Sequence, residues 1–315
     1  MKLSPWSIEQ KTYPLSDEFR LQKADKAEWG IFCSVYYSSE YNGFFKEQVY
    51  DFQLRRDPFW IYKGEDKVGG VVIEPNVLYL LFFIPPFNEE GMVLKILKNA
   101  LIQWSDSSKP IIVYEILPEQ ADLFARAGFW PDEFRCRWMQ RPTEAFTVDW
   151  DGELIVIEPK IRTENEDKKL IDQDEITKFF YECNIGRIDA VRRKQETVDS
   201  YISMIGSYPY LTNKVCLNAS SLVYEKQTNK LVGACLVSLE GTFSAVYEIA
   251  VMPGFHGRGI ATKMLKRALT GLKDHYPVLR LYVMQGNTAE SVYYNLGFMP
   301  GPLEVQKFHL PHKMD

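Results

Sequence analysis

The stretch of this sequence best suited to chemistry is a glycine-rich turn in its last third. A strand-like run that ends at Val251 leads into Met-Pro-Gly-Phe and then into His256-Gly257-Arg258-Gly259-Ile260-Ala261. Glycines let the backbone approach a ligand closely and turn several N–H groups in one direction. If a helix begins here, its first N–H groups lack partners and its dipole adds partial positive charge. The turn predicts a site for a pyrophosphate group, and the alternative is a plain strand-to-helix connection.

A second pattern lies downstream, where a strand-like run is followed by Gly-Asn-Thr-Ala-Glu-Ser-Val-Tyr-Tyr-Asn-Leu-Gly-Phe over residues 286–298. It predicts a short helix that ends at Gly297, with Asn287 or Thr288 as its cap. Neither motif has the Gly-x-Gly-x-x-Gly spacing of dinucleotide-binding proteins or the Gly-Lys-Ser/Thr of a P-loop. The usual nucleotide-binding fingerprints are therefore absent.

Together the two motifs resemble the acyl-coenzyme A signatures of the GNAT N-acetyltransferase superfamily. The turn in that superfamily has Gln or Arg, two variable residues, Gly, one variable residue, and then Gly or Ala. Here those positions run from His256 to Ala261, so His256 departs from the pattern. The later motif, Tyr-x-x-Leu-Gly-Phe, is matched at residues 293–298. The resemblance covers residues 153–310 and implies acetyl-coenzyme A as co-substrate; we expect His256 to weaken its binding without abolishing it.

The resemblance also implies roles for individual residues. Tyr293, rather than its neighbour Tyr294, corresponds to the acid that protonates the coenzyme A thiolate. Glu248 corresponds to the carboxylate that takes a proton from the amine, and the Val251 N–H to a donor for the thioester oxygen. Asn287 either contacts the cofactor or caps the helix. The expected cofactor-binding residues are Ile249, Ala250, Val251, His256, Gly257, Arg258, Gly259, Ile260, Ala261, Thr262 and Asn287.

The elements that must position these residues occur twice along the sequence. Both halves run strand, helix, hairpin, strand, loop, helix, strand, helix, Gly-Phe. In the second half we expect strands at residues 153–159, 221–225, 231–239, 243–251, 278–284 and 305–310, and helices at 172–183, 259–272 and 288–296. The duplication predicts an α/β (α+β) protein with two tandem GNAT-like domains, each a mixed central sheet flanked by helices. We place a degenerate domain at residues 1–145 and a catalytic acetyltransferase domain at residues 150–315.

The first domain lacks the features of a second active site. Its counterpart of the glycine turn, residues 84–92, has two prolines, which remove N–H donors, and the carboxylates Glu89 and Glu90. Counting back from Gly128 and Phe129, the position of Tyr293 is taken by Phe124, which cannot donate a proton. We expect this domain to form one wall of the acceptor cleft. Deleting residues 1–145 would then remove acceptor binding but spare coenzyme A binding.

Composition and charge narrow the range of partners. The formal net charge is −5, and all of the excess lies in residues 1–150, which hold 17 Lys+Arg against 22 Asp+Glu. That balance argues against nucleic acid, which needs a basic face. The sequence shows no membrane-length apolar run and no secretory signal, and its five cysteines and four histidines are scattered. We therefore expect a cytoplasmic protein with no membrane partner and no metal.

The acceptor is the least determined part of this interpretation. It is either a small-molecule amine or a protein amino group, and the arginines of residues 184–217 (Arg187, Arg192 and Arg193) could bind a carboxylate on it. Transfer of a longer acyl group is an alternative within the same site. A non-catalytic, coenzyme A-responsive sensor or scaffold is an alternative of another class. The sequence does not indicate an oligomeric state.

Overall fold

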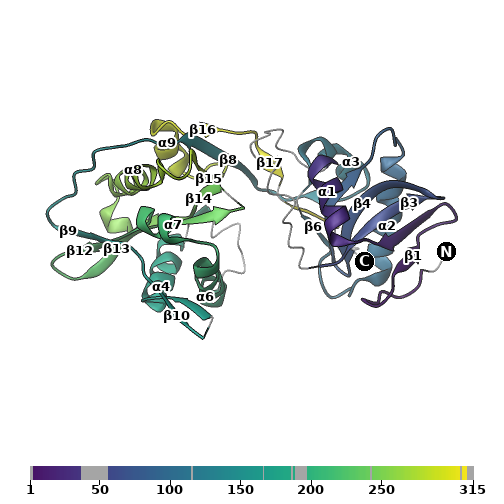
Figure 1. Ribbon diagram of the computed structural model, residues 1–315, viewed down its shortest axis with the longest axis horizontal. Coiled ribbons are helices and arrows are strands. Elements are labelled where there is room, and N and C mark those ends of the chain that lie inside the picture. Colours follow the sequence, from purple (N-terminus) through teal and green to yellow (C-terminus); the bar gives the residue numbers. More distant parts are fainter. Residues whose placement is uncertain are drawn as a thin grey trace. The chain divides into compact units, whose positions relative to one another are not determined.

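The computed structural model consists of two compact units, each built around its own sheet. The N-terminal unit comprises Met1–Arg135 and Glu304–Asp315, and the C-terminal unit comprises Cys136–Leu303. The structure describes residues 3–36, 56–114, 116–165, 167–185, 187–188, 197–241, 243–305 and 307–310. Arg192 and Arg193 lie outside the described residues. Each unit is a mixed sheet flanked by helices, which confirms the predicted fold class (Figure 1).

In the N-terminal unit the strand order is β1-β2-β3-β4-β5-β6-β18-β7, and β5 and β6 run parallel. Its elements are β1 (Thr12–Pro14), β2 (Phe19–Lys23), α1 (Lys26–Tyr36), β3 (Pro58–Lys63), β4 (Asp66–Glu74), β5 (Val77–Phe83), α2 (Glu90–Trp104), β6 (Ile112–Tyr114), η2 (Pro118–Gln120), α3 (Ala121–Arg126), β7 (Trp130–Pro131), β17 (Glu304–Val305) and β18 (Lys307–His309). Helix α2 buries one stripe of apolar side chains at helical spacing, from Val93 to Trp104. That stripe packs with β2–β6 into one core.

In the C-terminal unit the strand order is β16-β8-β15-β14-β13-β12-β9. Its elements are β8 (Arg135–Pro142), β9 (Leu154–Ile157), β10 (Ile161–Glu164), β11 (Asp167–Leu170), α4 (Gln173–Asn184), α6 (Val198–Ser207), η3 (Tyr208–Tyr210), α7 (Lys214–Ala219), β12 (Ser221–Glu225), β13 (Lys230–Glu240), β14 (Phe243–Val251), η4 (Pro253–Phe255), α8 (Ile260–Leu272), β15 (Val278–Met284), α9 (Ala289–Asn295) and β16 (Met299–Pro300). Strands β14 and β15 are parallel, and β8 is antiparallel to β15.

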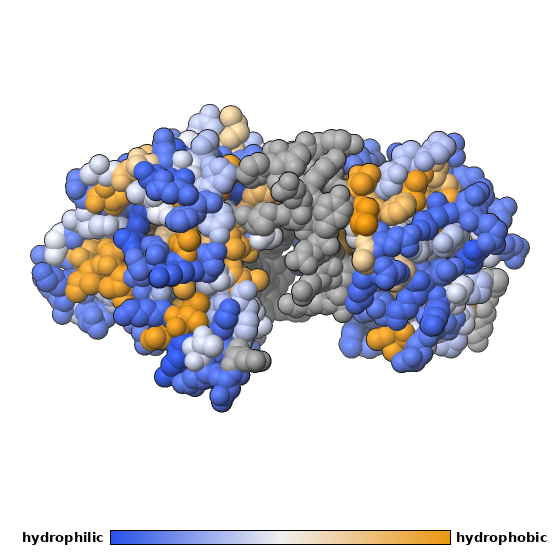
Figure 2. Space-filling view, in the orientation of Figure 1, coloured by the Kyte–Doolittle hydropathy of each residue, from blue (hydrophilic) through white to orange (hydrophobic). Residues whose placement is uncertain are grey.

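The central strands of this second sheet are covered on both faces. Leu236 and Ala250 share a core with side chains of α4 and α6, whereas Cys235 and Val251 share one with α7, α8 and α9. Two covered faces explain why β13 is almost continuously apolar rather than alternating. Figure 2 shows hydrophobic surface gathered over the β9–β12 edge of this unit, where Ile155 and Ile157 of β9 are exposed.

Each half of the chain contributes one strand to the sheet that the other half mainly builds, an arrangement that we call the strand exchange. The sequence analysis did not predict it. Strand β8, from the first half of the chain, pairs along its length with β15 in the C-terminal unit, as its colour shows in Figure 1. Strand β18, from the last residues, inserts between β6 and β7 of the N-terminal unit. The structure therefore moves the boundary from residues 145–150 to Arg135, with a second crossing at Leu303. Sequence proximity suggested the simpler division, but hydrogen-bond pairing decides which sheet a strand completes.

This exchange changes how the protein can be dissected. Deleting residues 1–145 would remove β8, which lies between β15 and β16 in the C-terminal sheet. The exposed N–H and C=O groups of β15 would then lack their partners. Such a truncation disrupts the C-terminal unit itself, so it cannot report on the contribution of the N-terminal unit.

Candidate active site

Strands β14 and β15 pair only at their starts. Their ladder consists of Ser244 with Leu279 and Ala245 with Arg280, although β14 continues to Val251. On its other side β14 stays paired with β13, but the register shifts so that Tyr247 is an extra residue, a β-bulge. A bulge bends its strand and increases the local twist. We call the separation of β14 from β15 beyond Ala245 the splay.

One edge of β14 faces the splay. The Met252 N–H donates to the Val232 carbonyl, at 2.9 Å, so it points toward β13. Because backbone groups of successive residues alternate in direction, the N–H and C=O of Val251 and Ile249 point the other way, into the splay. The end of β14 therefore directs the N–H groups of Ile249 and Val251 and the Ile249 carbonyl toward an extended ligand, while the Val251 carbonyl accepts from Arg187.

The glycine turn (residues 256–262) follows directly from this strand. Gly257 and Gly259 have φ of 77° and 72°, in the left-handed region that favours glycine. A Cβ at either position would meet nothing within 4 Å, so the backbone conformation, not crowding, requires glycine. The His256 N–H donates to the Pro253 carbonyl, at 3.2 Å, and the next amide with a backbone partner among the described residues is that of Lys263, which donates to the Gly259 carbonyl. The amides between these two, together with the start of α8, form the predicted arrangement for an anion.

Two residues from the second motif lie where α9 begins and ends. Tyr293 is buried, at 7% exposure, against Phe298 in the core that contains Val251, whereas Tyr294 is 66% exposed. The side-chain oxygen of Asn287 accepts a hydrogen bond from the Ala289 N–H, at 2.9 Å. Asn287 therefore forms an Asx turn that leads into α9, whose N-cap residue is Thr288.

Glu248 lies on the opposite face of the sheet from Tyr293. It pairs across the ladder with Leu236, whose side chain belongs to the α4–α6 core, and paired residues share a face. Its half-buried carboxylate acts on two neighbours there. Burial, with Glu248 adding to it, raises the pKa of Tyr247 to about 12 and that of the Cys183 thiol to about 11. Carboxylate and phenol thus reach the β14 strand from its two faces.

His256 and Arg187 meet the end of β14. The His256 Nε2 lies 2.8 Å from the Val251 carbonyl oxygen, and the Arg187 Nη2 lies 3.0 Å from the same ring nitrogen. Arg187 also donates to the Val251 carbonyl at 3.3 Å. One His256 tautomer accepts from Arg187 and the other donates to Val251, so either tautomer ties the ring into this triangle. The residue that departs from the superfamily pattern is therefore linked to a distant arginine.

Comparison with known proteins agrees with this geometry. The family model of the acetyltransferase (GNAT) domain matches residues 194–313. A GCN5-related N-acetyltransferase structure from Sphaerobacter thermophilus has a TM-score of 0.60 at 16% identity, covering 94% of this chain and 95% of its own. A tandem GNAT protein from the clavulanic acid biosynthesis pathway has a TM-score of 0.56 at 11% identity, covering 93% and 97%. Residues 194–313 thus match a GNAT domain, and the chain as a whole has the fold of tandem GNAT proteins.

A third GNAT structure, an acetyltransferase from Colwellia psychrerythraea, covers 92% of this chain and 99% of its own at 13% identity, with a TM-score of 0.56. Identities this low establish the fold alone. No curated protein is significantly similar to the sequence. Within the part of the chain that the structure describes, no helix is long and apolar enough to cross a membrane. The same described residues contain no group of three or more His, Cys, Asp or Glu arranged to hold a metal.

The N-terminal GNAT-like unit differs at each corresponding position. Glu89 stands at the N-cap of α2 and pairs with the Lys63 ammonium, at 2.6 Å. Phe124 is fully buried between the rings of Phe129 and Phe308. Glu89 is the carboxylate that we expected to repel a phosphate. Its negative charge is neutralised by Lys63 within the unit itself. Phe124 is a packing residue.

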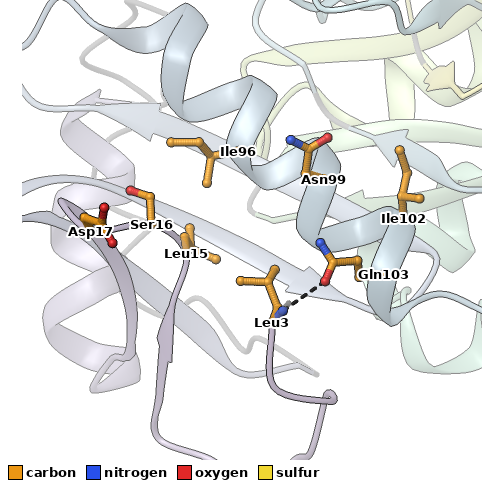
Figure 3. A pocket seen from close by; sticks show the side chains of 8 residues that line it. All are labelled: Leu3, Leu15, Ser16, Asp17, Ile96, Asn99, Ile102 and Gln103. Atoms are coloured by element: carbon orange, nitrogen blue, oxygen red, sulfur yellow. Dashed lines mark hydrogen bonds between the residues drawn. The ribbon is translucent and has the colours of Figure 1, made fainter. Parts of the chain in front are cut away.

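A hollow in the N-terminal unit lies apart from these positions. Its volume is about 550 Å³, and it separates the first residues of the chain from the outer side of α2 (Figure 3). The Leu3 N–H bridges it by donating to the Gln103 side chain, at 2.9 Å. The lining residues are Leu3, Leu15, Ser16, Asp17, Ile96, Asn99, Ile102 and Gln103. None of the site residues predicted from the sequence is among them.

All of the predicted site residues lie in the C-terminal unit, along β14, the glycine turn and the start and body of α9. Sequence reasoning missed the bulge at Tyr247, the buried thiol of Cys183 and the contact of Arg187 with His256. Bulges and contacts between distant segments leave no periodic trace in a sequence. The only available signal was that Arg187 lies in the polar, aromatic-rich stretch assigned to the acceptor.

Proposed function

We propose that the C-terminal unit is an N-acetyltransferase that transfers an acetyl group from acetyl-coenzyme A to an amine. The splay is the observation that carries this proposal: its strand edge leads directly into a turn whose amides, from Gly257 to Thr262, have no backbone partner among the residues that the structure describes. A long ligand with amide groups at one end and a pyrophosphate at the other could pair with the strand edge and place its pyrophosphate at the turn. Acetyl-coenzyme A is such a ligand, and the acceptor is a small-molecule amine or a protein amino group.

The described residues fit this co-substrate. Amides of the glycine turn, from Gly257 to Thr262, would hold the pyrophosphate, helped by the partial positive charge at the start of α8. The edge of β14 at Ile249 and Val251 would pair with the pantetheine arm, with Ala250 between them facing the α4–α6 core. The Val251 N–H would then donate to the thioester oxygen. Asn287 would serve by holding the start of α9, and thereby Tyr293.

The co-substrate supplies an activated acetyl group when bound, and the chain supplies proton transfer. An amine near pH 7 is protonated and a poor nucleophile, so Glu248 takes its proton. Tyr293, reaching the strand from the opposite face, gives a proton to the departing sulfur. With base and acid on opposite faces of β14, the acceptor would approach from the α4–α6 side and the sulfur would depart toward α9.

Direct transfer is favoured over an acylated cysteine. Burial raises the pKa of Cys183, the thiol whose pKa Glu248 also affects, to about 11. The thiolate is the nucleophilic form, so very little of it exists near pH 7. Cys216 on α7 and Cys235 on β13 are buried with raised pKa values as well. A two-step mechanism through any of these thiols lacks its nucleophile.

The test combines binding with turnover. Titration calorimetry with acetyl-coenzyme A should show binding, and thiol release should follow with at least one member of an amine panel. Glu248→Gln should retain binding and slow turnover by about 100-fold at pH 7, less at high pH where the amine loses its own proton. Glu240→Gln, a carboxylate at the far end of the same hairpin, is the matched control and should match the wild type. Binding without turnover on any amine would instead support the coenzyme A-responsive sensor.

A further inference from the structure

Arg187 lies at the junction between the splay and the glycine turn. Its backbone N–H is held by Asn184 at the end of α4, at 3.1 Å, and its side chain reaches Val251 and His256. The next residue, Ile188, lies against Gly286 just beyond β15, where an added Cβ would be 3.4 Å from the isoleucine Cδ1. The short segment of Arg187 and Ile188 therefore touches both sides of the splay at its open end.

The charge of Arg187 is not matched by its partners. Among the described residues, the hydrogen bonds of its side chain use Nη2 and go to neutral groups, a carbonyl and an imidazole. Within the described ranges no carboxylate lies within ion-pair distance of it. A guanidinium has five N–H donors in a rigid fork, and in the part of the chain that the structure describes Nε and Nη1 have no hydrogen-bond partner. An arginine held in place by neutral groups beside unpartnered amides has the chemistry of an anion-binding residue.

We infer that Arg187 binds a phosphate group of coenzyme A, together with the amides of the glycine turn, and that His256 is the positioning residue that holds it there. This inference rests on the proposed function of the site. Arg187 would bring from another segment of the chain the cation that His256 does not provide at the first position of the turn. It also explains why the substitution at that position is compatible with coenzyme A binding.

The sequence analysis suggested that Arg187 could bind a carboxylate on the acceptor. The position of Arg187 along β14 favours a phosphate of coenzyme A as its ligand instead. Glu248, the proposed base, is three residues before Val251, and three residues of strand span about 10 Å. Arg187 contacts Val251 and the first residue of the turn directly. Its guanidinium therefore lies where the strand edge passes into the glycine turn, between the position proposed for the thioester and the amides proposed for the pyrophosphate.

The experiment compares two probes by titration calorimetry: coenzyme A, and pantetheine, which lacks the phosphates. Arg187→Ala should weaken coenzyme A binding about 10-fold and leave pantetheine binding unchanged. The loss should shrink at 0.5 M NaCl, because salt screens charge pairing. Arg187→Lys should recover part of the affinity, and His256→Ala should cause a smaller loss. Arg162→Ala, which removes an exposed arginine of β10, is the matched control.

Other results would overturn the inference. Equal weakening of both probes would mean that Arg187 only maintains the end of β14. Unchanged coenzyme A affinity, with a raised KM only for amines that carry a carboxylate, would place Arg187 in the acceptor site. Unchanged behaviour with every ligand would refute the inference and leave the proposed function standing. Failure of the wild type to bind coenzyme A would refute the proposed function and this inference with it.

Discussion

The strand exchange makes an unusual prediction about Phe308, a residue close to the C-terminus. Its side chain, 1% exposed on β18, packs in the core of the N-terminal unit and lies 5.7 Å from the ring of Phe124. Phe298, only ten positions earlier, is equally buried at 1% exposure but lies in the core of the C-terminal unit beside Tyr293. The two phenylalanines form a matched pair that differs only in the unit each one stabilises.

Replacing either phenylalanine by alanine should cost about 3–5 kcal/mol, because a fully buried ring is lost and the surroundings collapse only partly. For Phe308→Ala the loss should fall on the N-terminal unit, since β18 lies between β6 and β7. For Phe298→Ala it should fall on the C-terminal unit and slow turnover through the displaced Tyr293. If the chain were divided once, at residues 145–150, both phenylalanines would belong to the second domain and both variants would destabilise it.

Hydrogen exchange measured by mass spectrometry separates these expectations. A loss of 3 kcal/mol should speed exchange in the affected core by about 100-fold or more. Phe308→Ala should therefore speed exchange in β4–β6 and spare β13 and β14, and Phe298→Ala should do the reverse. Tryptophan fluorescence gives a second measure, because five of the seven tryptophans lie before residue 136. Faster exchange confined to β13 and β14 in Phe308→Ala would refute the strand exchange.

Two further predictions concern the site and its core. In thiol-release assays, Tyr293→Phe should lower kcat at least 10-fold with little change in coenzyme A affinity. Tyr294→Phe, at a 66% exposed position, should match the wild type. The reverse result would assign the role of the acid to Tyr294. Burial raises the pKa of Cys235 to about 12 and that of Cys216 to about 11, from 9.0. These thiols ionise at a lower pH in the unfolded chain than in the folded one. Their contribution to the free energy of unfolding is therefore complete below pH 9 and is lost as the pH rises toward 11–12. Urea unfolding at pH 8 and 10.5 should show the loss, with about 2 kcal/mol less of it in Cys235→Ala; an unchanged pH dependence in that variant would contradict the assignment.

The elements that carry the site were predictable because their patterns are local. The strands at residues 221–225, 243–251 and 278–284 begin and end where the sequence indicated. The glycine turn was identified from residue types alone, since only glycine adopts its positive φ angles easily. The count back from Gly297 and Phe298 selected Tyr293 over Tyr294, and the structure buries the former and exposes the latter. The roles of these residues in catalysis stay predictions.

The sequence by itself therefore determined the glycine turn, the strands and helices next to it and the duplication, because each of these is written in neighbouring residues, whereas it did not indicate β8, β10, β11, α6 and α7. Only the tertiary structure decided where β8 and β18 belong, since an alternating pattern specifies a strand but not the sheet that it joins. The bulge at Tyr247 and the contact between Arg187 and His256, 69 positions apart, also required three dimensions. They depend on hydrogen-bond register and on side chains meeting across the fold, and neither is encoded in local spacing.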